Sequence, residues 1–239
     1  MKHITAENLY DYAFLNEDTL VRPLRGICVC FHGYTDATTY GSSPEIARTL
    51  GAAGVAWVFP YYSVWAWMSR TSQVYNEQVL DAVYERLGAD ESTPLILSGG
   101  SMGGLTALNY AVYGKRRAVG CALNCPVTDF NRVFEDMPDV RRAILSAHVD
   151  ADAPIDEVMR HYSPVQLVNR FPRVPYYFLF GECDAYFTDI HRPALTVRLD
   201  EAGVDYTLRI QPGMGHCTME QHPDAMAAFV GFIVSLVNG

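Results

Sequence analysis

Short apolar runs, most of them uninterrupted, alternate with segments of helical periodicity from residue 26 to the C-terminus. Uninterrupted apolar runs of this length are typical of strands buried on both faces of a parallel sheet. Their alternation with helices favours a mostly parallel, doubly wound sheet with helices on both faces. The expected strands span residues 26–31, 55–60, 94–99, 118–125, 174–181 and 205–212.

The helical segments carry apolar residues at every third or fourth position. The first helix is expected to take Ser43 as its N-cap, because a proline and an acid follow it directly, as is typical of a first turn. Two segments near the N-terminus, YDYAFL and TLVRP, are expected to form an antiparallel hairpin at one edge of the sheet. The other apolar stripes lie within residues 79–87, 105–112 and 226–236.

The alternation breaks once, at residues 126–173, where a long segment of mixed helical character separates two expected strands. Connections of this length are usually functional. This one would lie above the carboxyl ends of the strands, where open α/β sheets bind ligands. We therefore expect one α/β domain, residues 1–239, with a short helical lid at 126–173.

The strongest chemical motif is GGSMGG at residues 99–104, directly after an expected strand and before an expected helix. It matches the G-x-S-x-G pattern, in which a sharp turn exposes a serine hydroxyl at a helix N-terminus and glycines make room for the turn. Backbone N–H groups and the helix dipole favour negative charge there. The motif predicts that Ser101 is a nucleophile and that the Met102 N–H is an oxyanion donor. The alternative is a glycine-rich turn with an incidental serine.

A second motif, FHGY at residues 31–34, ends the first expected strand. A chain that leaves a strand through His-Gly can turn a backbone N–H toward the nucleophile, so the Tyr34 N–H is the expected second oxyanion donor. His32 precedes the serine, whereas in the fold that carries the G-x-S-x-G turn the chain order is serine, acid, histidine. We expect His32 to be a structural histidine satisfied by loop carbonyls.

The acid should follow a later strand, and residues 174–181 lead directly to Glu182 and Asp184. We favour Asp184, because a position further past the strand end lets the loop turn a carboxylate toward the base. Glu182 would then cap a turn. Asp184 would orient the imidazole and stabilise it when protonated.

The base should follow the last strand, where the loop QPGMGH ends at His216. His216 is expected to take the proton of Ser101 and to donate it to the leaving group. His222 is the alternative, but it stands beside Pro223, where a helix cap is expected.

Charge and composition narrow the function classes. The net charge of −9 argues against a nucleic-acid partner, because phosphate binding requires clustered Lys and Arg. No cysteine spacing matches a zinc or haem motif, so we expect no metal. The longest apolar run, residues 225–237, is interrupted and too short to cross a bilayer, and the N-terminal residues lack a signal-peptide core. With six cysteines and no such signal, we expect a cytoplasmic protein without a membrane partner.

The chain resembles the α/β-hydrolase superfamily, and within it the stand-alone catalytic domains of prolyl oligopeptidase-like hydrolases and their esterase relatives. The resemblance rests on FHGYTD, SGGSMGG, PVTDF, YSPVQL, FLFGECDAYF and GMGH, which occur in the family's order from residue 26 to the C-terminus. It implies a triad of Ser101, Asp184 and His216, oxyanion donors at Tyr34 and Met102, and no cofactor. No motif matches the acidic pair by which dipeptidyl peptidases hold a free amino terminus, which favours an ester over a peptide as substrate.

The substrate pocket is less clearly marked. The loop after the second expected strand is rich in aromatic residues and predicts a wall of the binding cleft formed by Trp65, Trp67 and Met68. Packing beneath a lid is the other interpretation. The hypothesis is a serine hydrolase acting on a small to medium carboxylic ester, with a short peptide or amide hydrolase as the alternative. A binding protein without catalysis is a further alternative.

Overall fold

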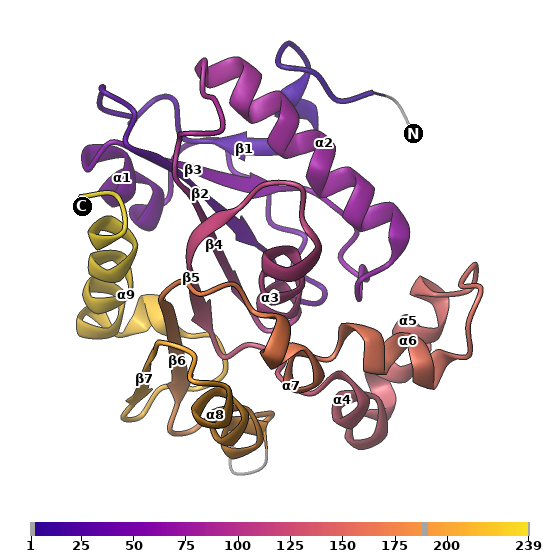
Figure 1. The fold of residues 1–239 in the computed structure, drawn as a ribbon. Coiled ribbons are helices and arrows are strands. Elements are labelled where there is room, and N and C mark those ends of the chain that lie inside the picture. The colour runs from indigo at the N-terminus through magenta and orange to yellow at the C-terminus, as the bar shows by residue number, and fades with distance from the viewer. Residues whose placement is uncertain (1–2, 188–190, 239) are drawn as a thin grey trace.

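A single seven-stranded sheet organises the computed structural model, which describes residues 3–187 and 191–238 (Figure 1). The strand order is β1-β3-β2-β4-β5-β6-β7, and β1 pairs antiparallel with β3 while all other pairs are parallel. The predicted mostly parallel sheet is therefore confirmed. The strands are β1 Ala13–Leu15, β2 Gly26–Phe31, β3 Val55–Pro60, β4 Leu95–Gly100, β5 Ala118–Asn124, β6 Tyr176–Gly181 and β7 Tyr206–Gln211.

Helices cover both faces of the sheet, as the sequence predicts (Figure 1). On one face, Leu50 of α1 and Phe229 of α9 share a buried apolar cluster with Cys28 of β2. On the other face, Leu80 of α2 and Leu199 of α8 belong to a second cluster. The helices are α1 Glu45–Ala52, α2 Arg70–Leu87, α3 Met102–Tyr113, α4 Phe130–Asp136, α5 Pro138–Ala147, α6 Ile155–Tyr162, α7 Pro164–Leu167, α8 His191–Ala202 and α9 Pro223–Ser235.

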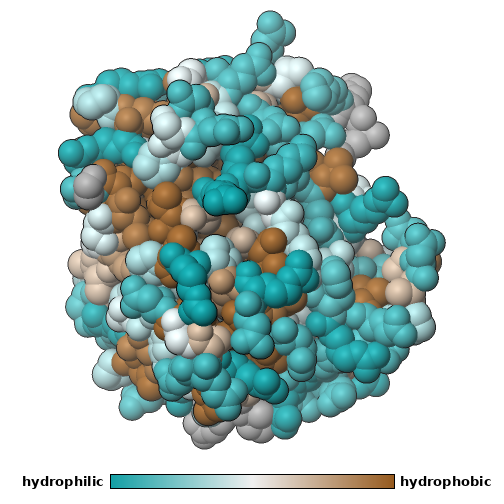
Figure 2. All heavy atoms as spheres, viewed as in Figure 1, coloured by the Kyte–Doolittle hydropathy of each residue, from teal (hydrophilic) through white to brown (hydrophobic). Residues whose placement is uncertain are grey.

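Burial along the strands explains why they were recognisable. β3 and β6 are buried at every position and read as continuous apolar runs. The edge strand β7 departs from this relation, because its apolar Leu208 and Ile210 are exposed whereas the polar Gln211 is buried. The face shown in Figure 2 is mostly hydrophilic, with hydrophobic residues in smaller groups. Within the described residues, no helix is both long and apolar enough to cross a membrane.

Two local predictions near the N-terminus are wrong. Only Ala13–Leu15 forms a strand, and it pairs with β3 rather than with residues 19–23, which form turns and irregular chain. The reason is tertiary: the buried Asn16 side chain accepts a hydrogen bond from Trp57 N and donates one to Ala47 O, which leads the chain away from a hairpin. Ser43 does not cap α1, because its hydroxyl donates to Asp18 and accepts from Thr19.

The direction in which successive strands are added to the sheet reverses at β2, and this switch point determines where the loops after β2 and β4 lie. The chain passes from β2 to β3 on one side and returns to place β4 on the other side of β2. The carboxyl ends of β2 and β4 therefore lead into loops that diverge and leave a crevice between them, where ligands bind in such sheets. The segment between β5 and β6 forms helices α4 to α7, which lie together at one end of the sheet (Figure 1).

Candidate active site

Ser101 stands at the turn between β4 and α3, in a backbone conformation that side-chain-bearing residues rarely adopt. Its φ of 52° and ψ of −121° lie outside the helical region. Non-glycine residues with positive φ persist only where the surroundings enforce them, and they cluster at functional sites. Here Ser101 N donates to Asn124 O at 3.1 Å, and Val127 N donates to Ser101 O at 3.0 Å. Backbone hydrogen bonds to Asn124, at the end of β5, and to Val127, shortly after it, therefore hold Ser101 in place.

Two glycines make this turn possible. A Cβ on Gly99 would overlap the backbone of Gly103, and a Cβ on Gly103 would overlap the carbonyl oxygen of Phe31 in β2. The first turn of α3 thus lies directly against the neighbouring strands, closer than any side chain allows. The glycines of the motif are required by this close packing.

Asp184 and His216 meet above the ends of β6 and β7. His216 Nδ1 lies 2.8 Å from Asp184 Oδ2, and the Asp184 side chain is fully buried. The two loops run against each other, since Cys183 N donates to Met214 O at 2.9 Å. The structure therefore brings together the predicted acid and base, which stand 32 positions apart in the chain.

Residues 186 and 187 complete the environment of this pair and were missed by the sequence analysis. Their backbone N–H groups donate to Asp184 Oδ1 at 2.8 and 3.1 Å. The rings of Tyr186 and Phe187 pack edge-on against His216, with centroids 5.1 and 5.0 Å away. The sequence signal was the AYF that directly follows Asp184. These residues fix both the carboxylate and the plane of the imidazole.

The electrostatics of the pair follow from burial and hydrogen bonding. Burial alone would raise the pKa of Asp184, but hydrogen bonds from His216, Tyr186 N and Phe187 N, together with the nearby imidazolium charge, bring that pKa below its ordinary value. Burial alone would lower the pKa of His216, but the Asp184 carboxylate and the Cys125 thiol raise it to about 9. The pair is thus built to stabilise a protonated imidazole.

The alternative residues considered from the sequence occupy other positions. Glu182 accepts a hydrogen bond from Gly213 N at 3.0 Å and caps that turn, as expected. His222 is the residue before α9. His32 is buried, its ring nitrogens lie 2.9 and 3.1 Å from the carbonyl oxygens of Gly33 and Tyr62, and its ring stacks on Tyr62. The expectation of a structural His32 is confirmed.

The residues expected to supply the oxyanion donors, Met102 and Tyr34, belong to segments that adjoin Ser101. Met102 is the first residue of α3, so its N–H precedes the first intrahelical hydrogen bond. The loop that carries Tyr34 lies beside the serine, because a Cβ on Gly33 would stand 3.7 Å from Ser101 Cβ. Tyr34 and Ser101 line the same cavities.

Two cavities open on Ser101 and His216 from opposite sides. One, of about 530 Å³, lies toward α1 and α9 and includes Tyr40 and Cys217 in its wall. The other, of about 330 Å³, lies toward the 126–173 segment and has a largely apolar wall. We call them the α9-side and α5-side cavities. The α5-side wall consists of Tyr34, Thr35, Trp67, Ser101, Met137, Asp139, Val140, Tyr186, Phe187 and His216.

The predicted aromatic wall is only partly assembled at Ser101. Trp67 is 2% exposed, lines the α5-side cavity and stacks on Phe130 with centroids 5.7 Å apart. Trp65 is 56% exposed and is part of neither of the two cavities at Ser101. Met68 lines a separate cavity beneath α6 that does not reach Ser101. The positive φ of Trp67 and Met68, 36° and 63°, turns the chain so that their side chains diverge.

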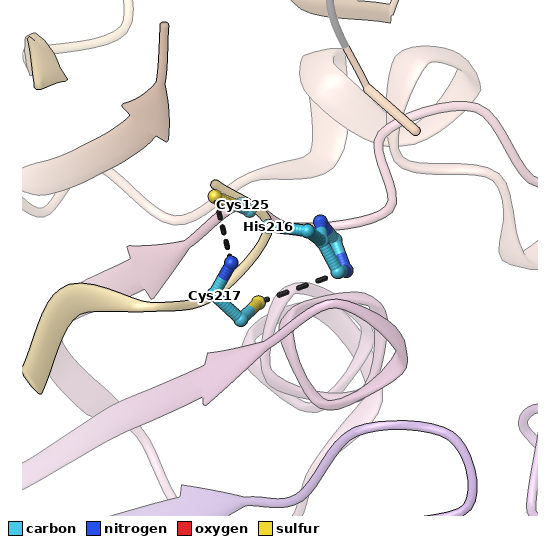
Figure 3. Close-up of side chains that lie close together, drawn as sticks. All are labelled: Cys125, His216 and Cys217. Carbon is cyan, nitrogen blue, oxygen red and sulfur yellow. Dashed lines mark hydrogen bonds between the residues drawn. The ribbon is translucent and has the colours of Figure 1, made fainter. Parts of the chain in front are cut away.

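Two cysteines lie beside the histidine, which the sequence analysis did not anticipate. Cys217 Sγ lies 3.7 Å from His216 Nε2, and Cys217 N donates to Cys125 Sγ at 3.5 Å (Figure 3). Hydrogen bonds from Cys217 and His216 bring the pKa of the Cys125 thiol below its ordinary value. Cys125 comes from the end of β5 and Cys217 from the loop after β7, so only the fold brings them together.

Comparisons with known proteins agree with this architecture. No protein-family model matches the chain, and no curated protein matches it. Among solved structures, esterase B from Lactobacillus rhamnosis (HN001) is similar with a TM-score of 0.68 and 20% identity, over 91% of this chain and 76% of that one. An S-formylglutathione hydrolase from Agrobacterium tumefaciens gives a TM-score of 0.67 and 16% identity, over 95% and 89% of the two chains.

A puromycin-hydrolysing peptidase from Mycobacterium tuberculosis is also similar, with a TM-score of 0.73 and 16% identity over 95% of this chain. The present chain spans only 37% of the length of that peptidase. These neighbours are α/β-hydrolases, and the chain accordingly has the α/β-hydrolase fold that its sequence motifs led us to expect.

Proposed function

We propose that this chain is a serine hydrolase that cleaves small to medium carboxylic esters through Ser101, His216 and Asp184. One observation carries the proposal. A buried Asp184 holds His216 at 2.8 Å, and His216 lines the same two cavities as a serine in a strained turn at a helix N-terminus. A structural role does not require that combination of burial, strain and shared access.

The arrangement suits acyl transfer by a covalent intermediate. Ser101 Oγ would bond to the acyl carbon while its proton passes to His216 Nε2, and the Asp184 carboxylate would stabilise the imidazolium. The carbonyl oxygen would become an oxyanion held by the N–H groups of Tyr34 and Met102. His216 would then protonate the departing alkoxide. Water would release the acid by the same steps in reverse, without a cofactor.

The two cavities suggest how an ester would lie. The α5-side cavity is apolar and small, which suits a short acyl or alkyl chain. Its wall includes Met137 and Val140 from the 126–173 segment, and this contact supports the proposal that the segment is a lid on one domain of residues 1–239. The similarity in fold to esterase B from Lactobacillus rhamnosis also supports an ester substrate.

The cysteines support the proposal of a cytoplasmic protein. All six are free thiols in the structure, which suits a reducing compartment such as the cytoplasm.

The test is hydrolysis of p-nitrophenyl esters from acetate to laurate by the purified chain, beside Ala-Pro-p-nitroanilide. Ser101→Ala serves as the blank, and a fluorophosphonate probe reports whether Ser101 reacts. We expect turnover that decreases with chain length and is lost in Ser101→Ala. Turnover that survives in Ser101→Ala contradicts the assignment of the nucleophile.

An amide or peptide substrate is the second candidate, and the similarity to the puromycin-hydrolysing peptidase favours it. Anilide cleavage at an efficiency comparable to that of the esters would select it. An intact fold with neither turnover nor fluorophosphonate labelling would instead indicate a binding protein.

A further inference from the structure

Three possible metal-binding side chains lie together beside the α9-side cavity, and two of them, His216 and Cys217, are part of its wall. Cys125 Sγ, Cys217 Sγ and a ring nitrogen of His216 lie within 4.8 Å of one another, and Cys217 Sγ lies 3.7 Å from His216 Nε2 (Figure 3). Two thiolates and an imidazole are a donor set that Zn²⁺ prefers, and three protein ligands leave a fourth position open. The set comes from two separate loops, which explains why no sequence motif revealed it.

The spacing is close to that of a coordinated ion. Bond lengths of about 2.3 Å to sulfur and 2.05 Å to nitrogen in a tetrahedron place sulfur about 3.6 Å from nitrogen and about 3.8 Å from the other sulfur. Cys217 Sγ already lies 3.7 Å from His216 Nε2. The remaining separations exceed these values by at most about 1.2 Å, a change that small side-chain rotations supply.

The surroundings of the three donors are those of a metal site in two further respects. Metal-binding histidines usually donate their other ring nitrogen to a carboxylate, which fixes their orientation, and His216 Nδ1 faces the buried Asp184. Both cysteines also have backbone φ values in the left-handed region, 45° for Cys125 and 55° for Cys217. Such strain in non-glycine residues persists where the surrounding structure enforces it.

The geometry points to a Zn²⁺ site formed by Cys125, Cys217 and His216. In this site the ion binds His216 Nε2, the nitrogen that would accept the Ser101 proton in the proposed reaction. Binding releases the protons of the two thiols, and the Sγ–H of Cys217 gives up its hydrogen bond to Asn124 O at 3.3 Å. Two thiolates neutralise the divalent charge, which lowers the cost of holding it in a half-buried place.

The consequence is reversible inhibition. A metal on His216 Nε2 removes the lone pair that would accept the Ser101 proton, so the zinc-bound protein cannot form the acyl-enzyme. This consequence rests on the proposed function, whereas the binding of the ion does not. Access is available through the α9-side cavity, whose wall includes both His216 and Cys217.

The experiment titrates the reduced, metal-free protein with Co²⁺ and then with Zn²⁺. Co²⁺ held by thiolates gives a charge-transfer absorption in the near ultraviolet, which Zn²⁺ should abolish at one ion per chain. In parallel, Zn²⁺ should stop ester hydrolysis at the same stoichiometry, and EDTA should restore the rate.

The variants Cys125→Ala and Cys217→Ser each remove one ligand, and Cys183→Ser removes an exposed thiol as the matched control. Each ligand variant should weaken Zn²⁺ binding by at least the roughly 10- to 100-fold that loss of a residue supporting a metal ligand causes, and zinc inhibition, measured against each variant's own uninhibited rate, should weaken in parallel. Cys183→Ser should bind zinc as the unaltered chain does. Thermal melting identifies a variant that fails to fold, and the half-buried Cys217 is the safer of the two positions.

The outcomes separate the two proposals. No thiolate absorption with Co²⁺, or absorption that persists unchanged in both ligand variants, overturns the site even if the protein hydrolyses esters. Zinc that binds through the thiolates without slowing hydrolysis shows that Nε2 is not a ligand, and this also overturns it. If the protein neither cleaves esters nor reacts at Ser101, the proposed function fails, and the Co²⁺ titration alone decides the metal site.

Discussion

The loops that carry Ser101, Asp184 and His216 differ sharply in construction from the helices that face them. The loops are held by backbone contacts: α3 begins where only glycine fits against β2, and the acid and base loops are joined from Cys183 N to Met214 O. Helix α5, by contrast, contributes the side chains of Val140 and Ile144 to the core and exposes Leu145.

This difference separates two tasks. Backbone contacts tolerate almost no change and hold the reacting groups in register, which acyl transfer requires. Side-chain packing from an amphipathic helix tolerates substitutions of similar volume, so the α5 wall can vary in shape without disturbing the reacting groups. We therefore expect substitutions in the first region to abolish activity or folding, and substitutions in the second to change substrate preference.

The largest effect is expected at the acid. Asp184→Asn removes the charge that stabilises protonated His216, and kcat/KM for a short p-nitrophenyl ester should fall by about 10³- to 10⁴-fold. The matched control is Glu182→Gln, a neighbouring carboxylate that caps the Gly213 turn and should cost less than about tenfold. Equal losses in the two variants would show that Asp184 has no special role.

The next effect concerns stability. Gly103→Ala places a methyl group against the Phe31 carbonyl oxygen and should lower the free energy of unfolding by about 3 kcal/mol or more. Gly231→Ala, in the interior of α9 with nothing within 4 Å of the added Cβ, should raise it by up to about 1 kcal/mol. Urea unfolding measures both. A Gly103→Ala protein as stable as the parent would mean that α3 and β2 are not in close contact.

The pH dependence of turnover tests the environment of the base. Only neutral His216 accepts a proton, so kcat/KM should rise with pH through the raised pKa of about 9. The Cys125 thiol contributes to the raised pKa of His216, so Cys125→Ala should lower that pKa and move the pH–rate profile to lower pH. Each pH unit of movement increases the rate at pH 7 about tenfold. Profiles are measured with EDTA present.

The same raised pKa has a consequence for stability. In the parent, the lowered pKa of the Cys125 thiol has the opposite effect on stability over the same pH interval, so the test uses Cys125→Ala, in which Asp184 still raises the pKa of His216. There, protonated His216 should stabilise the native state fully below about pH 6.5, and this contribution should be lost at higher pH. A stability that increases with pH above about 6.5 in Cys125→Ala but not in the double variant with His216→Gln would contradict the assignment.

The smallest effect is expected in the segment of residues 126–173, which we propose to be a lid. Val140→Ala enlarges the α5-side cavity, so kcat/KM for acetate should fall while that for longer acyl chains rises, each by about three- to tenfold. Leu145→Ala on the same helix is the control, because its side chain is 46% exposed and lines no part of that cavity. A uniform loss over all chain lengths in Val140→Ala would indicate general destabilisation instead.

The parts of the fold that could be predicted from the sequence are those with local causes. Continuous apolar runs identified the buried strands, and the predicted boundaries lie within two residues of the observed ones. The edge hairpin failed because Asn16 takes its partners from α1 and β3, 31 and 41 positions away. Helix α8 was not recognised, since it has no clear apolar stripe in its sequence.

The candidate site likewise has residues that local sequence patterns indicate and residues whose placement they do not. Ser101 could be predicted because a strained turn needs glycines at set positions beside it, and Asp184 and His216 because the order of strands places their loops at one edge of the sheet. The aromatic loop was harder, because the direction of each side chain depends on positive φ values at Trp67 and Met68 that the sequence does not reveal.

By itself, then, the sequence determined the parallel sheet and the residues proposed for the reaction, because apolar periodicity and glycine sterics act over a few neighbouring positions. Only the tertiary structure decided which side chains surround those residues. Cys125 and Cys217 stand 92 positions apart and meet because the end of β5 and the loop after β7 lie at the same edge of the sheet. Contacts of that kind depend on how the chain packs, and no local pattern records them.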